Sequence, residues 1–181
     1  MMFEETLQQP NLTRNGGDLR TRQRILEAAF GLIAQRGLSG ELLKDSAALA
    51  GYSIERAEVF FRRDEDLVIA LYARLAAQLE SRVTELPEGD VATRFRAAML
   101  FKLEIVSPYR ETLASLLATL LDPRHELGAL SPQMEVIRNR VMSFFYSVVL
   151  GATGVRKNSS TEIVHSLYAA HLVLVLLWSQ D

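Results

Sequence analysis

Cysteine is absent from this chain of 181 residues. Without a thiol, the chain forms no disulfide bond, offers no thiolate ligand to a metal and performs no cysteine-based catalysis. The lack of cysteine suits a reducing compartment, and we expect a cytoplasmic protein.

The chain also lacks a strong excess of one charge, since its formal net charge is −2 at pH 7. No global basic field draws it to nucleic acid, so any such attraction must be local. The first 18 residues contain no apolar run and no basic start, and predict no secretion signal. The longest apolar run, 163–178, is interrupted by polar residues and is shorter than the roughly 20 residues of a membrane-spanning helix. We expect a helix buried on most sides there, and no membrane span.

Catalytic motifs are missing too, because neither a glycine-rich phosphate loop nor a nucleophile motif is visible. Glu162 and His165 have the spacing of a carboxylate–histidine metal pair, but only Glu104 and Glu135 could complete such a site. We therefore expect a protein that is not an enzyme, with no catalytic residue, metal or cofactor.

Helical periodicity is what the sequence does contain, and no stretch shows the sustained alternation of a strand. The sequence therefore predicts an all-α fold, with Asp18, Ser53, Asp64 and Ser131 as helix caps. The expected helices are 19–36, 42–50, 54–60, 64–84, 90–106, 107–121, 131–152 and 160–178.

Three regions follow from the pattern of helices and breaks. Residues 1–17 are polar and predict a flexible arm, 18–66 predict a head of three helices, and 67–181 predict a helical body. The helix at 64–84 joins head to body, before Pro87 and Gly89 interrupt the chain.

Residues 44–61 have the layout of a helix-turn-helix. Glycine tolerates the turn after a helix, as Gly51 would, and serine is a good N-cap, as Ser53 would be. The second helix of such a pair can enter the DNA major groove. A DNA-binding head is therefore expected.

The order of several segments resembles the DNA-binding head of TetR-type (tetracycline-repressor-type) regulators over about residues 20–70. The segments are Thr21 to Phe30 with its ILEAA run, Ala34 to Gly37, Ala47 to Ser53, Phe61, and Asp64 to Leu67. The resemblance implies a homodimeric, ligand-responsive transcriptional regulator that binds a double-stranded DNA operator. Within this family the expected role is that of a repressor. It also implies an apolar small-molecule effector and a dimer interface made by the last two helices.

Three sets of residues follow from this resemblance and from the helix pattern. DNA contacts are expected from Lys44, Tyr52, Ser53, Arg56, Arg62 and Arg63. Contacts with the apolar effector are expected from Phe95, Met99, Leu103, Leu117, Met142 and Phe145. The dimer interface is expected to contain Phe144, Val148, Leu167, His171, Leu174 and Trp178.

The expected recognition helix departs from the family by its acidity. Glu41, Glu55, Glu58 and Asp64 stand where the family usually has residues that bind phosphate or DNA, and residues 18–67 carry eight cations against nine anions. An alternative is therefore a TetR-like protein that has lost DNA binding and carries an apolar or lipid ligand, or acts as an interaction module. Short segments are similar to the accessory lipid-binding proteins of ubiquinone biosynthesis, which have such a fold.

Overall fold

The structure is a computed structural model that describes residues 11–38, 40–155 and 160–180, with side chains described from residue 16 onward. No strand occurs in these ranges, so the prediction of an all-α fold is confirmed. The helices are α1 (Asn11–Arg36), α2 (Leu42–Leu49), α3 (Ile54–Glu58), α4 (Asp64–Ser81), α5 (Val91–Val106), α6 (Arg110–Ser115), α7 (Leu117–Leu121), α8 (Glu135–Leu150) and α9 (Ser160–Gln180). Single 3-10 turns are η1 (Val83–Glu85), η2 (Ser107–Tyr109) and η3 (Pro132–Met134).

α1 is longer than the sequence predicts. It begins at Asn11, so the expected flexible arm is wrong for residues 11–17, and its remaining residues lie outside the described ranges. No proline follows Pro10 in this stretch, and each of Gly16 and Gly17 opposes a helix by only about 1 kcal/mol. Asp18 therefore lies inside α1 rather than capping it.

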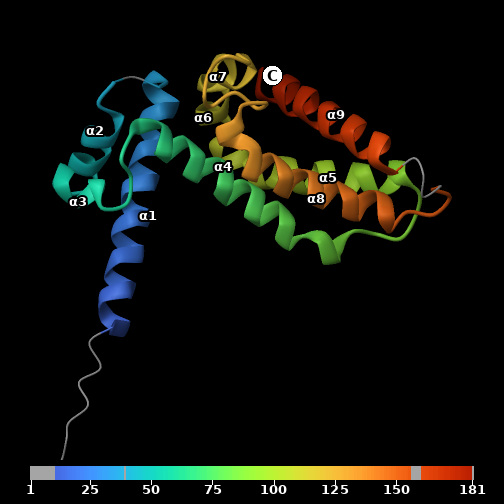
Figure 1. Cartoon of the computed structure of the whole chain (residues 1–181), viewed down its shortest axis with the longest axis horizontal. Coiled ribbons are helices and arrows are strands. Elements are labelled where there is room, and N and C mark those ends of the chain that lie inside the picture. The colour runs from blue at the N-terminus through green and yellow to red at the C-terminus, as the bar shows by residue number, and fades with distance from the viewer. Residues whose placement is uncertain (1–10, 39, 156–159, 181) are drawn as a thin grey trace, which may run out of the picture.

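The first three helices pack into an N-terminal unit at one end of the molecule (Figure 1). The predicted stripe along α1 is confirmed, since its apolar residues are almost fully buried where α1 packs against α2, α4 and α6. Its members are Ile25, Leu26, Ala29, Phe30 and Ile33.

The turn between α2 and α3 has the predicted chemistry. Gly51 adopts a left-handed φ of 81°, which glycine tolerates without strain. The Ser53 hydroxyl accepts a hydrogen bond of 3.3 Å from the Arg56 backbone N–H and caps α3. α3 ends at Glu58, two residues before the predicted end.

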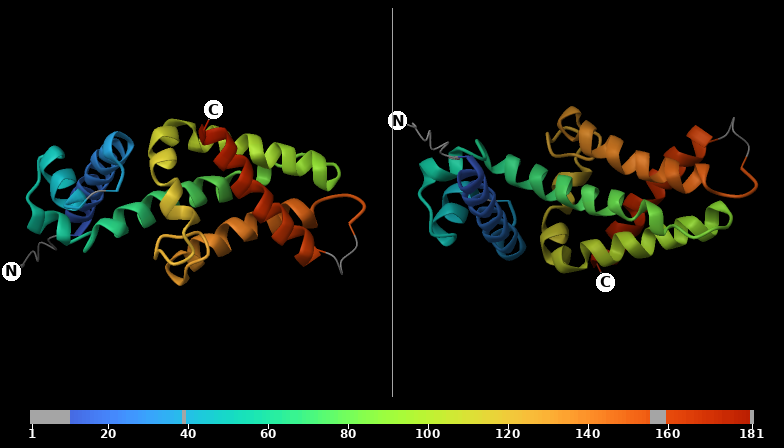
Figure 2. Two further views of the ribbon diagram at one scale, coloured as in Figure 1. Left: turned by 90° about the horizontal axis from the view of Figure 1, so that it is seen from above. Right: turned by 90° about the horizontal axis from the view of Figure 1, so that it is seen from below.

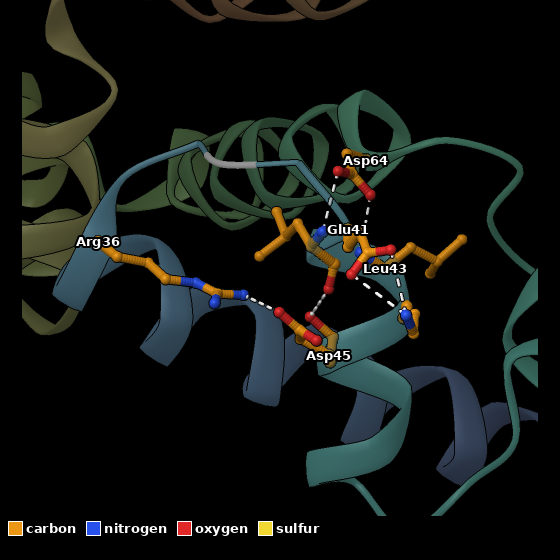
Figure 3. Close-up of polar contacts among 8 residues, drawn as sticks. Arg36, Glu41, Leu43, Asp45 and Asp64 are labelled. Carbon is orange, nitrogen blue, oxygen red and sulfur yellow. Dashed lines mark hydrogen bonds and ion pairs between the residues drawn. The ribbon is translucent and has the colours of Figure 1, made fainter.

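Asp64 does not cap α4, contrary to the prediction. It is the first residue of α4, and its carboxylate accepts hydrogen bonds from the N–H groups of Leu42 (2.9 Å) and Leu43 (2.7 Å) at the start of α2 (Figure 3). Glu41, which precedes α2, has a φ of 68° and makes no capping bond. The carboxylate of Asp64 therefore satisfies two donors that Glu41 leaves open.

α4 leaves the N-terminal unit and runs along the body, which contains α5 to α9 (Figure 1). The two halves of α4 belong to two apolar clusters. The N-terminal cluster holds the core of α1–α3 together with Leu67, Leu71 and residues of the body such as Leu116. The body cluster is centred on Phe144, Phe145 and their neighbours in α8.

Residues 107–121 do not form the single predicted helix. η2, α6 and α7 follow one another, and the helix breaks at Leu116, whose side chain is 1% exposed. The break turns Leu116 into the N-terminal cluster, while Leu117 beyond it lines a cavity in the body.

α9 crosses the body obliquely, between α5 and α8 (Figure 2). The expectation that this helix is buried on most sides is wrong for the single chain. One face is buried at Val164 and His171, whereas Val173, Leu174 and Leu177 are between 42% and 59% exposed. By length and composition, the 21 residues of α9 could cross a membrane, although a core helix can pass the same criterion.

Candidate functional site

The body contains an apolar cavity of about 110 Å³, which is lined by residues from all the helices from α4 to α9. A single water needs roughly 10–15 Å³ of such space, so this cavity has room for a small organic molecule. Most of its wall consists of aliphatic side chains from α4 to α9. These include Leu75, Val106, Leu113, Leu117, Leu120, Ile137, Val141, Leu172, Val175 and Leu176.

Of the six expected effector contacts, Leu117 lines this cavity. Phe95, Met99, Met142 and Phe145 are instead packed between the helices of the body, and Leu103 packs against the N-terminal cluster. Helical periodicity identifies the apolar face of a helix. It does not show whether that face packs against another helix or lines a cavity. Most of the expected effector contacts therefore lie outside the cavity, in the packed interior of the body.

The polar residues that line the cavity were not among the expected effector contacts. They are Tyr72 on α4, Lys102 on α5, Arg138 on α8, and Tyr168, His171 and Ser179 on α9. One feature of the sequence could have indicated this polar part of the lining. Lys102 interrupts the apolar pattern of α5, and a lysine is unusual on a packed helix face.

Lys102 borders the cavity and is only partly exposed. Its surroundings are apolar, and this burial lowers the pKa of the Lys102 ammonium to about 8. Among the described residues no carboxylate offsets the effect, because the lining includes neither aspartate nor glutamate. At neutral pH Lys102 is therefore a cation with no anion beside it in the described part of the lining.

His171 is buried at the same wall, not at the surface where a partner chain could reach it. Its ring lies 5.1 Å from that of Phe145 and 4.9 Å from that of Tyr168, measured between ring centres. Burial and the nearby charge of Lys102 lower the pKa of His171 to about 3. His171 is therefore neutral at physiological pH.

The second cation of the lining, Arg138, is partly engaged by the backbone. Its Nη1 donates hydrogen bonds of 3.1 Å to the carbonyls of Ala129 and Ser131, which fixes the loop before α8. Burial raises the pKa of Tyr168 against the opposing effect of Arg138, and burial raises the pKa of Tyr72 well above its usual range. Both phenols stay neutral and can donate a hydrogen bond to a ligand.

Most of the expected dimer residues are internal to the single chain. Phe144 and Val148 are at most 1% exposed and belong to the body cluster, as does the partly buried Leu167. Trp178 packs against the N-terminal cluster under the guanidinium of Arg110. Among the six expected residues, Leu174 has the exposure that a contact with a second chain requires. α8 and α9 bury these side chains against each other and their neighbours within one chain.

The expected DNA contacts lie on α2, α3 and the start of α4, but three of the cations are paired within the chain. Lys44 contacts Glu41 at 3.1 Å, Arg63 contacts Glu126 at 3.0 Å, and Arg56 on α3 pairs with Asp18 on α1. Arg62 is exposed and makes no ion pair within the described residues. Tyr52 is half-buried, and Ser53 is occupied as the cap of α3.

A basic concave surface on α1 lies beside the expected contact Tyr52. Tyr52 lies beside the first turns of α1, and Arg20, Arg22 and Arg24 share the concave surface with it. Arg20 and Arg24 are exposed, and the Arg22 guanidinium lies 5.1 Å from the centre of the Phe61 ring. Because α1 and α3 lie in one unit, this surface could extend a nucleic-acid interface beyond α3.

The cavity and the N-terminal unit share structural elements. On α4, Leu67 and Leu71 are buried in the N-terminal cluster, and Tyr72 and Leu75 line the cavity one turn later. On α6, the Thr112 hydroxyl donates a hydrogen bond of 3.1 Å to the carbonyl of Phe30 in α1, next to Leu113 in the cavity wall. A displacement of α4 or α6 would therefore also displace α1, because α1 packs against both helices.

Comparison with known proteins adds no assignment. No protein-family model matches the sequence, and a search of curated proteins finds no significant match.

Proposed function

We propose that the protein is a ligand-responsive DNA-binding regulator of TetR type, with the apolar cavity as its sensor and α1–α3 as its DNA-binding head. The observation that carries this proposal is the sharing of α4 and α6 between the cavity wall and the core around α1. A cavity built only to store a ligand does not need such a connection. Ligand binding would change the angle of α4 and thereby the position of the head.

In this proposal α3 is the recognition helix of a helix-turn-helix. Its Arg56 would exchange Asp18 for a base or a phosphate, and Lys44 and Arg63 would exchange their glutamates for phosphates. Exposed ion pairs of this kind contribute only about 0–1 kcal/mol, so a phosphate can displace a carboxylate at small cost. Arg62 and the arginines of α1 would supply the remaining attraction.

We further propose a homodimer, since two half-sites of an operator require two heads. The exposed apolar face of α9, formed by Val173, Leu174 and Leu177, is the face that dimerisation would cover. This choice replaces the buried residues Phe144, Val148 and His171 as the expected contacts.

The test of the DNA-binding proposal is selection from a random double-stranded DNA library, followed by titration of the selected sequence at several salt concentrations. Arg62→Ala should lower the affinity and reduce the slope of log K against log salt by about one, because one phosphate contact is lost. Arg124→Ala is the matched control, since this arginine lies in the body and its side chain is 94% exposed.

Two results would contradict DNA binding by this head. One is the failure of selection to enrich any sequence at low and at moderate salt. The other is an equal effect of the Arg62 and Arg124 substitutions, which would show that charge anywhere on the surface has the same influence.

A second candidate function is a TetR-like carrier of an apolar ligand that does not bind DNA. The specific observation in its favour is the engagement of the head by its own carboxylates, above all Asp64 on the first N–H groups of α2 (Figure 3). A DNA phosphate cannot use these N–H groups while Asp64 holds them. Lipid mass spectrometry of the purified protein, beside the DNA selection, distinguishes the candidates: a bound apolar ligand without any DNA complex supports the carrier.

A further inference from the structure

Among the described residues, the charged side chains around the cavity are all of one sign. Lys102 comes from α5 and Arg138 from α8, and no acidic residue is among the lining side chains. The remaining titratable groups are Tyr72 on α4 and Tyr168 and His171 on α9, and all three are neutral at pH 7 because burial disfavours their charged forms. An otherwise aliphatic cavity therefore has a positive wall.

Lys102 is the less satisfied of the two cations. Arg138 donates to two backbone carbonyls, whereas burial is the one cause that shifts the pKa of Lys102, with no partner opposing it. A partly buried ammonium without a counter-ion among the described residues still carries a desolvation cost, and an apolar residue at this position would avoid it. The position of Lys102 suits an anion that arrives with a ligand.

We propose that the cavity binds an apolar carboxylic acid, with its carboxylate paired with Lys102 and its hydrocarbon part against the leucines of α6, α7 and α9. This inference rests on the proposed ligand-binding function and specifies its chemical class. A carboxylate carries one negative charge and balances one ammonium, and the charge-assisted hydrogen bond between them is strengthened by the apolar surroundings. The neutral phenols of Tyr72 and Tyr168 border the same space and can donate to a second carboxylate oxygen.

The pairing makes binding depend on pH above neutrality. Over this range a carboxylate stays ionised and arginine side chains in general keep their proton. Burial keeps Tyr72, Tyr168 and His171 neutral. Lys102 loses its proton as the pH rises through about 8 in the empty protein. Affinity for a carboxylate should therefore fall between pH 7 and pH 9.5, while affinity for an uncharged analogue of the same length stays constant.

The experiment compares pentanoate with pentan-1-ol, which are of a size that suits a cavity of about 110 Å³. Binding of each compound is measured by isothermal titration calorimetry. The full chain is titrated at pH 7 and pH 9.5, beside Lys102→Met and the control Arg96→Met, which removes an exposed cation from the same helix.

Wild type and Arg96→Met should bind pentanoate at least about tenfold more tightly than pentan-1-ol at pH 7, and this preference should shrink at pH 9.5. Lys102→Met should lose the preference and still bind the alcohol, which shows that its cavity is intact. Equal affinities for acid and alcohol in wild type, or a preference retained by Lys102→Met, would overturn the carboxylate inference and leave ligand binding standing. Binding of neither compound would overturn the ligand-binding function itself.

Discussion

His171 shows how strongly the position of a single residue decides its chemistry. Its ring is buried between the rings of Phe145 and Tyr168 and near Lys102, and these neighbours disfavour the imidazolium form. On the sequence alone, the same histidine was assigned to a surface between two chains. Its burial has a measurable consequence for stability in acid.

Substitution of His171 by leucine should make the protein less sensitive to acid. The folded protein holds a neutral His171 down to a pKa of about 3, whereas the unfolded chain protonates it near pH 6.5. The unfolded state therefore binds more protons between these values, and the stability of the wild type falls as the pH falls. By pH 4.5 the difference should reach on the order of 2 kcal/mol relative to pH 7.

Urea denaturation of wild type and His171→Leu at pH 7, pH 5.5 and pH 4.5 measures this difference. The control is His165→Leu, because it removes an exposed histidine from the same helix and shows any effect of the substitution that does not depend on burial. Parallel stability curves for wild type and His171→Leu would contradict the assigned burial of the imidazole.

At the scale of elements, the N-terminus of α2 depends on a residue that lies more than twenty positions away. Asp64 opens α4 and accepts from Leu42 and Leu43 of α2, so one carboxylate ties two helices together. Capping residues are predicted from neighbours within a few positions in the sequence. Such a prediction does not detect a hydrogen bond between residues that are distant in the sequence. For this reason the sequence wrongly predicts Asp64 as the cap of α4.

Asp64→Ala should therefore destabilise the protein by about 1–3 kcal/mol, because two helix N–H groups lose their acceptor. Glu65→Ala is the matched control, since Glu65 lies in the same first turn of α4 and makes no hydrogen bond within the described residues. Thermal unfolding followed by circular dichroism measures both. A cost for Glu65→Ala as large as that for Asp64→Ala would point to the charge of the helix terminus rather than to the cap.

At the scale of the whole molecule, the exposed apolar face of α9 is the feature that a single chain leaves unexplained. Val173 and Leu177 are 53% and 59% exposed on a helix that packs its other face into the body. A soluble homodimer would cover this face, and a membrane surface could cover it instead.

Leu177→Asp should convert the proposed dimer to a monomer, because a carboxylate at the centre of an apolar interface loses its hydration without a partner. Light scattering coupled to size-exclusion chromatography gives the mass directly. Val59→Asp is the control, since Val59 is similarly exposed (66%) but lies in the N-terminal unit. A wild type that is monomeric at every concentration would contradict the proposal.

The sequence alone determined the all-α class, the apolar stripe of α1, the glycine turn before α3 and the serine cap of α3. These features are local, because periodicity, turn conformation and capping depend on residues within one or two turns of each other. The tertiary structure decided where long-range partners meet: Asp64 at α2, Arg56 at Asp18, the break at Leu116, and Lys102 beside His171. An apolar helix face can pack against a neighbour, line a cavity or stay exposed, depending on how the neighbouring helices are arranged. The pattern of residues along the chain does not specify that arrangement.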